Sequence, residues 1–155
     1  MDEPDTDLLD IELLTGLQFR DTNGLVISKV GNPNNKEQEA QFFPNPVQGV
    51  FSVFSLRSIR NIWLAPAVVS MDYEEVDFDI ELSELNYSRE EVEQIQIRTI
   101  DAAGTNNITI DVSDFTAGYY RIFYEFIDGE IAWDNAYIDP DTDFLSSSSF
   151  LLSEW

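Results

Sequence analysis

The feature that most constrains the fold of this chain is a series of short apolar runs separated by turn signals. The runs recur about every 8 to 12 residues, and Gly, Pro, Asn and Asp are concentrated between them. Most runs either alternate apolar and polar residues or are rich in β-branched and aromatic residues, which is typical of strands. The pattern therefore predicts an all-β protein built from antiparallel strands.

Strand number and spacing predict an antiparallel, immunoglobulin-like β-sandwich of about eight strands. Two turn dipeptides mark hairpins: Asn23-Gly24 before residues 25–30, and Asp128-Gly129 before residues 130–138, where we expect a type I′ turn. A helix signal occurs at residues 88–94, where Ser88 and Glu91 have the spacing of a capping box. We expect at most one short helical turn, near these residues.

The segment Pro44-Asn45-Pro46 stands directly before the apolar run GVFSVFSL, residues 49–56. Each Pro fixes φ and lacks an N–H donor, so the segment opens a strand and cannot continue a sheet ladder. The run that follows is apolar at both odd and even positions. It therefore predicts a strand that is buried on both faces.

The length and the 43% of hydrophobic residues are sufficient for one domain with its own core. We expect an acidic, flexible leader at residues 1–9, a single sandwich domain at residues 10–138 and a tail at residues 139–155. The tail ends in FLLSEW, which could dock on a partner, add an edge strand to its own sheet or stay disordered. Self-docking or disorder is the favoured interpretation.

Charge and composition exclude several classes of function. The chain has 30 Asp and Glu residues against 8 Lys and Arg residues, a formal net charge of −22, so nucleic acids and anionic membranes are unfavourable partners. It has no Cys and no His, which removes disulfides, thiolate chemistry and the usual general base near neutral pH. We therefore expect a protein that is not an enzyme.

Acidic residues suggest two sites, each with a simpler explanation. Asp21 and Asn23 resemble the start of a calcium loop, but they supply only two local ligands and also fit a plain hairpin turn. Asp77, Asp79 and Glu81 lie about 7 Å apart on one strand face. This row is typical of a solvated face; contact with a cation or a basic partner is an alternative, and glycosidase chemistry needs two carboxylates facing each other across a cleft.

Aromatic residues on predicted strands are the candidates for ligand contact. Exposed rings on a sandwich face can stack on sugars, although strand aromatics also pack in cores. Tyr120, Ile122, Tyr124 and Phe126 share one parity and are expected in the core. The candidates for ligand binding are Tyr119, Trp63, Trp133 and Tyr137.

Several segments together resemble the C-terminal β-sandwich sorting domains of Bacteroidetes type IX secretion cargo. In that family an aromatic-Pro-Asn-Pro segment opens the first strand, and an Asp-x-Ser-x-Leu segment later leads into Gly-x-Tyr and a closing hairpin. The resemblance covers roughly residues 41 to 138, with a long insertion in the middle. The matching residues are Phe43, Pro44, Asn45, Pro46, Asp111, Ser113, Phe115, Gly118 and Tyr120.

The acidic segment at residues 2–7 looks like the region that follows the lipid-bearing Cys of surface-exported lipoproteins from the same bacteria. The resemblance implies a non-catalytic binding or accessory protein of the cell envelope, at the outer-membrane surface or in the periplasm. Its expected partner is a protein or a glycan, and its only membrane contact would be a lipid anchor. A carbohydrate-binding module and a secretion sorting module are the alternatives, and no cofactor is expected apart from the calcium considered at Asp21.

Overall fold

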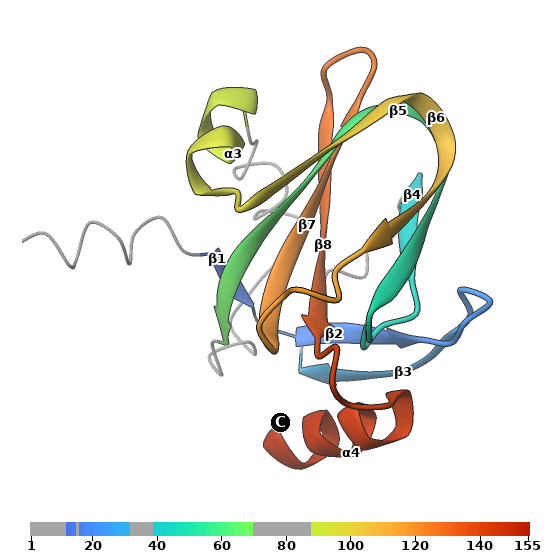
Figure 1. Ribbon diagram of the computed structural model, residues 1–155, viewed down its shortest axis with the longest axis vertical. Coiled ribbons are helices and arrows are strands. Elements are labelled where there is room, and N and C mark those ends of the chain that lie inside the picture. Colours follow the sequence, from blue (N-terminus) through green and yellow to red (C-terminus); the bar gives the residue numbers. More distant parts are fainter. Residues whose placement is uncertain (1–11, 15, 32–38, 70–87) are drawn as a thin grey trace, which may run out of the picture.

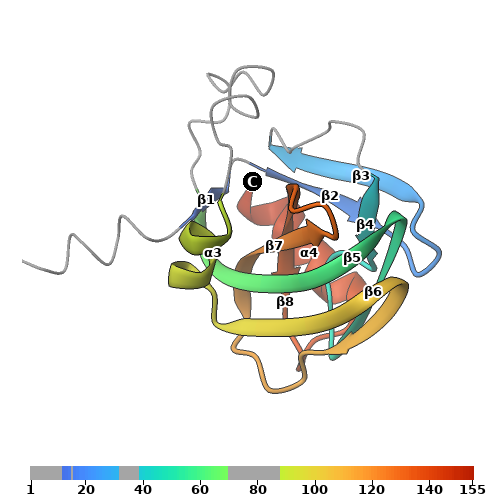
Figure 2. The same cartoon turned by 90° about the horizontal axis from the view of Figure 1, so that it is seen from above.

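The computed structural model describes residues 12–14, 16–31, 39–69 and 88–155. Its architecture is an all-β sandwich made by one strongly curled sheet and a smaller hairpin, as Figures 1 and 2 show. The strands are β1 (Glu12–Leu14), β2 (Gly16–Arg20), β3 (Val26–Gly31), β4 (Ala40–Phe43), β5 (Val50–Val69), β6 (Arg98–Asp111), β7 (Gly118–Phe126) and β8 (Ile131–Ile138). The helices are α3 (Arg89–Ile95) and α4 (Phe144–Glu154).

Strand β5 organises the large sheet because it pairs with four other strands. Its first part pairs with β4, its second part pairs with β7, and β6 follows it along both parts. Its end pairs in parallel with β1, and β8 pairs with β7. The register shifts between Phe54 and Ile59, where β5 bends, so the two parts of the sheet face each other. Figure 2 shows β5 and β6 following the same curve.

The main core lies inside this curled sheet. Apolar side chains from both parts of β5 and from β4, β6, β7 and β8 meet there. Tyr120, Ile122, Tyr124 and Phe126 belong to it, which confirms the prediction made from their shared parity. Each fully buried Leu, Ile or Phe side chain contributes about 1.5 to 3 kcal/mol, so this cluster is the main source of stability.

The outer face of β7 and β8 is also covered, at both ends. Helix α3 packs Val92 against Trp63, Phe123 and Trp133. At the other end, Leu151 of α4 and the β2–β3 hairpin form a second cluster, and Figure 1 shows the two helices at opposite ends of the molecule. The middle of the sheet is therefore buried on both faces.

Local sequence explains the helix and the hairpins. Ser88 caps α3, its side chain accepts from the Glu91 N–H, and the Glu91 carboxylate accepts from the Ser88 N–H, so the capping box is confirmed. Both predicted hairpins, β2–β3 and β7–β8, are present. The type I′ turn at Asp128-Gly129 is wrong, because Gly129 has a positive φ of 93° and Asp128 does not.

Two further predictions need correction. The run at residues 49–56 is buried on one face only: Phe51 and Val53 are in the core, whereas Val50 and Phe54 are exposed. The tail docks on its own domain, which confirms the favoured self-docking, but it does so as a second helix, α4, and not as an edge strand. Asp143 begins this helix by accepting from the Ser146 N–H. The expected strand at residues 76–83, with its acidic row, lies outside the described residues, and the immunoglobulin-like topology stays a prediction.

Candidate functional site

The segment Pro44-Asn45-Pro46 is a structural connector between three strands. Both of its Pro residues follow cis peptide bonds. The Asn45 backbone forms an antiparallel bridge with Arg20 at the end of β2. The fully buried Asn45 side chain donates to the carbonyls of Gln18, at 2.7 Å, and Asn135, at 3.1 Å, and accepts from the Tyr137 N–H.

This segment also completes the hydrogen bonds of the outer edge of β8. Val47 donates its N–H to the Tyr137 carbonyl at 2.7 Å and accepts from the Asp139 N–H at 2.9 Å. Together with Asn45 it satisfies edge groups that would otherwise be available for pairing with another chain. The sequence motif therefore caps a sheet edge, a role that its two prolines alone do not predict.

The other residues of the family resemblance shape the loop between β6 and β7. Asp111 accepts from the Ser113 hydroxyl at 2.6 Å and from its N–H at 2.8 Å, and these bonds lower the pKa of the Asp111 carboxyl. Gly118 begins β7. The Tyr120 hydroxyl donates to the Thr116 carbonyl at 2.5 Å, its ring packs on Phe115, and burial raises its pKa. These contacts fix the loop in place.

The four candidate ligand-binding rings lie in two packed clusters and not on one exposed face. Trp63 and Trp133 are buried beneath α3. Tyr137 is buried and Tyr119 half-buried beside α4, where Trp155 donates to the Tyr119 hydroxyl at 3.3 Å and Tyr119 donates to Glu154. Burial, and then Glu154, raise the pKa of Tyr119. Ligand binding by these rings stays a prediction.

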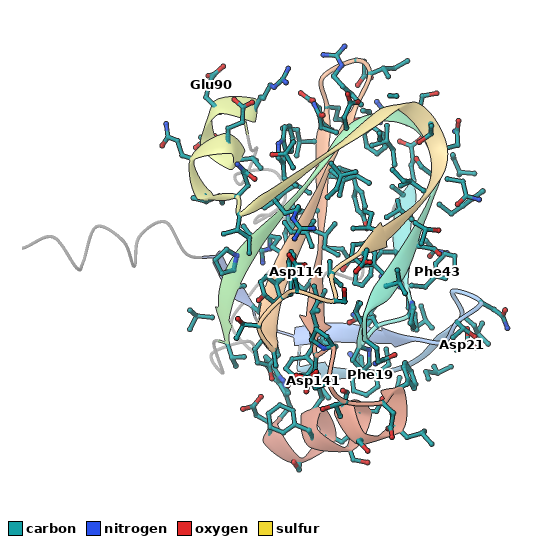
Figure 3. All side chains as sticks on the ribbon, viewed as in Figure 1. Phe19, Asp21, Phe43, Glu90, Asp114 and Asp141 are labelled. Carbon is teal, nitrogen blue, oxygen red and sulfur yellow. The ribbon has the colours of Figure 1, made fainter. Side chains whose placement is uncertain are left out.

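Asp21 and Asn23 form a hydrogen-bonded turn. The Asp21 carboxylate accepts from the N–H groups of Asn23, at 2.9 Å, and Leu25, at 3.0 Å. Figure 3 shows Asp21 at the hairpin turn, on the same side of the molecule as Phe43. Within the described ranges, no cluster of three or more Asp, Glu, His or Cys side chains could hold a metal ion.

A buried ion pair, which the sequence pattern did not reveal, crosses the core. Arg20 of β2 donates to Asp134 of β8 at 2.6 Å and to the Phe42 carbonyl at 3.2 Å, and its guanidinium lies 5.1 Å from the centre of the Phe42 ring. Burial lowers the pKa of Arg20, but Asp134 more than offsets this and the pKa is raised. The two charged groups pair with each other inside the protein and away from solvent, so the pair has a structural role.

The exposed apolar side chains form the best candidate for a contact site. We call Phe43, Val50, Phe54 and Leu56 the outer strand face. On β5 the exposed fractions are 50% for Val50, 46% for Phe54 and 72% for Leu56. Phe43 is half-buried at the end of the adjacent strand β4. These positions alternate with core residues, so their side chains leave the sheet on its solvent side.

The hairpin turn extends this surface. A Cβ placed on Gly24 would lie 3.0 Å from Gln41 Nε2 and 3.2 Å from Phe43 Cδ1, so the turn rests directly on β4. Gly24 has a positive φ of 86°, which favours glycine here. Leu25, the next residue in the chain, is 65% exposed and adds apolar surface at this turn.

The chain has no match among known protein families, curated proteins or solved structures. Neither α3 nor α4, in the described part of the chain, is long and apolar enough to cross a bilayer.

Proposed function

We propose that this chain is a non-catalytic binding or accessory protein of a bacterial cell envelope that contacts a protein partner. The observation that carries the proposal is the exposure of Phe54 and Leu56 beside each other on one strand face. Contiguous patches of large, exposed apolar side chains often mark sites of protein contact. The lack of His and Cys in the sequence supports a role without catalysis.

The cell-envelope location comes from the sequence alone. It is supported by the resemblance of residues 41–138 to the Bacteroidetes sorting domains and by the acidic segment at residues 2–7, which lies outside the described residues. A surface lipoprotein predicts a lipid-bearing Cys immediately before this segment in the gene product. Sequencing the gene and labelling its product with a radioactive fatty acid test this part.

Site-specific photo-cross-linking tests the binding role. The photoreactive residue p-benzoylphenylalanine replaces Leu56, Ile127 or Leu145, three exposed apolar positions on β5, the β7–β8 turn and α4. After irradiation in the cells that produce the protein, mass spectrometry identifies any captured protein. We expect one protein to be captured reproducibly. Because the proposed role is not catalytic, the captured protein should carry no covalent modification other than the cross-link. If none of the three positions captures a protein, the binding role is wrong.

Two alternative functions stay predictions and have their own tests. A glycan array tests carbohydrate binding, because a module with an accessible aromatic platform gives reproducible hits. Fusion of residues 41–155 to a reporter tests the sorting module, because a sorting signal exports the reporter in a type IX secretion host.

A further inference from the structure

We propose that the outer strand face docks a protein whose contact surface is apolar at its centre and basic around its rim. This inference rests on the proposed binding function and adds to it the site and the chemical class of the partner. The apolar centre consists of Phe54 and Leu56, with Val50 and Phe43 beside them. Interfaces of this kind combine an apolar core with a polar, charged rim.

Negative charge borders the apolar centre on one side. Asp111 pairs with Val50 across β5 and β6, and its carboxyl pKa is lowered by the hydrogen bonds from Ser113, so it is ionised at neutral pH. Asp21 lies in the turn beside Leu25 and accepts from the Leu25 N–H. A partner with Lys or Arg at matching positions would meet charges of opposite sign at the rim.

A second group of acids lies beside Leu56. The Leu56 N–H donates to the Glu39 carbonyl at 2.8 Å, which places Glu39 next to it. Arg57 contacts three carboxylates, those of Glu39 at 3.0 Å, Asp128 at 2.5 Å and Glu130. One guanidinium among three carboxylates leaves an excess of negative charge next to Leu56 in the chain, where Arg57 stacks on the Phe126 ring.

The same charges argue against a second copy of this chain as the occupant. Each copy carries a formal charge of −22, so two copies meeting at this face would repel each other. The two occupants respond to salt in opposite directions. Added salt weakens attraction between an acidic face and a basic partner, whereas it relieves repulsion between two acidic copies.

Three labelled peptides test the chemistry of the face on the full chain. The probe alternates Leu and Lys (LKLKLKL), one control replaces Leu with Ser, and another replaces Lys with Glu. Fluorescence anisotropy measures their binding at low and high NaCl concentration. We expect the Leu–Lys peptide to bind, both controls to bind at least about tenfold more weakly, and high salt to reduce binding.

Paired substitutions locate the binding. Phe54→Gln with Leu56→Gln alters the outer strand face, and Leu145→Gln with Leu152→Gln makes a matched change at two exposed apolar positions of α4. We expect at least about a tenfold loss of affinity for the first pair and little change for the second. Urea unfolding of each variant shows whether the fold is retained, and single substitutions replace any pair that unfolds.

Three results would overturn the inference: equal binding of the Leu–Lys and Ser–Lys peptides, undiminished binding by the Phe54→Gln, Leu56→Gln variant, or salt-enhanced self-association that this variant abolishes. The last result assigns the face to a second copy. In the cross-linking experiment, capture from Ile127 or Leu145 but not from Leu56 would disprove the docking face and leave the binding role intact. Capture from none would disprove the binding role itself.

Discussion

Replacing Asn45 with Ala removes a side chain that connects three parts of the fold. The amide nitrogen donates to the carbonyls of Gln18 and Asn135, and the amide oxygen accepts from the Tyr137 N–H. Asn45 is fully buried, so water cannot replace these bonds without opening the structure. The substitution therefore leaves two carbonyls and one N–H without these partners.

The expected loss follows from these groups. Each buried polar group without a partner costs about 1 to 3 kcal/mol, and carbonyls lie at the lower end because they keep a second lone pair. We expect the free energy of unfolding to fall by about 3 to 5 kcal/mol, a large part of the about 5 to 15 kcal/mol that stabilises a typical domain. With an m value of about 2 kcal/mol per molar urea, the midpoint falls by about 2 M.

Urea unfolding followed by Trp fluorescence measures this change, because Trp63 and Trp133 are buried in the folded protein. The matched control is Asn107→Ala on the exposed side of β6, which we expect to change stability by less than about 0.5 kcal/mol. A loss below about 1 kcal/mol for Asn45→Ala at an unchanged m value would refute the account of Asn45 as an edge cap.

Three further substitutions test other parts of the structure. Asp134→Asn leaves the buried guanidinium of Arg20 without its counter-ion and should lower the free energy of unfolding by about 3 to 5 kcal/mol. The control Asp114→Asn, in an exposed ion pair, should lower it by at most about 1 kcal/mol. Equal losses in urea unfolding would contradict the structural role of the Arg20–Asp134 pair. Burial raises the pKa of Tyr124, whose hydroxyl has no hydrogen-bond partner among the described residues. The contribution of the neutral Tyr124 to the free energy of unfolding is therefore fully present below about pH 10 and is lost as the pH rises above it. Tyr124→Phe should leave stability at pH 7 nearly unchanged and reduce the alkaline loss measured by urea unfolding at pH 9 to 11, to which Tyr119, Tyr120 and Tyr137 also contribute. An unaltered pH profile would disprove this. Ser88→Ala removes the capping box and should lower the free energy of unfolding by about 0.5 to 2 kcal/mol in the same assay. If the free energy of unfolding does not change measurably, the capping box does not stabilise the protein.

Local rules predicted the elements that depend on neighbours in sequence. Two turn dipeptides located both hairpins, and the spacing of Ser88 and Glu91 located α3, because such signals need only a few consecutive residues. The same rules failed in two places. The run at residues 49–56, which is expected to be buried on both faces, is one part of the longer strand β5, in which Ser55 bonds to the N–H and carbonyl of Arg57 and the chain bends without leaving the sheet. The tail, for which a helix was not expected, forms α4, which Asp143 begins.

The buried polar contacts could not be predicted in the same way. Arg20 and Asp134 are 114 residues apart in sequence, and Asn135 donates to the Gly16 carbonyl 119 residues away. Neither contact follows from periodicity or from turn chemistry, because each depends on where the curled sheet brings β2 against β8. The surroundings of the four candidate aromatic residues could not be predicted for a related reason: parity along β7 separates two faces, but only the positions of α3 and α4 decide which faces are covered.

The two parts of β5 differ in a way that links the fold to the proposed docking face. In the second part, Ile62 and Leu64 enter the main core, while Trp63 and Ala65 pack beneath α3, so both faces are used for stability. In the first part, only the inner face is used, and apolar residues on the outer face remain exposed. The apolar outer face of the first part is the surface that the proposed partner would cover. Phe54 and Leu56, and not the aromatic rings, are therefore the proposed contact residues, and a bound partner would bury the side chains that the chain itself leaves exposed.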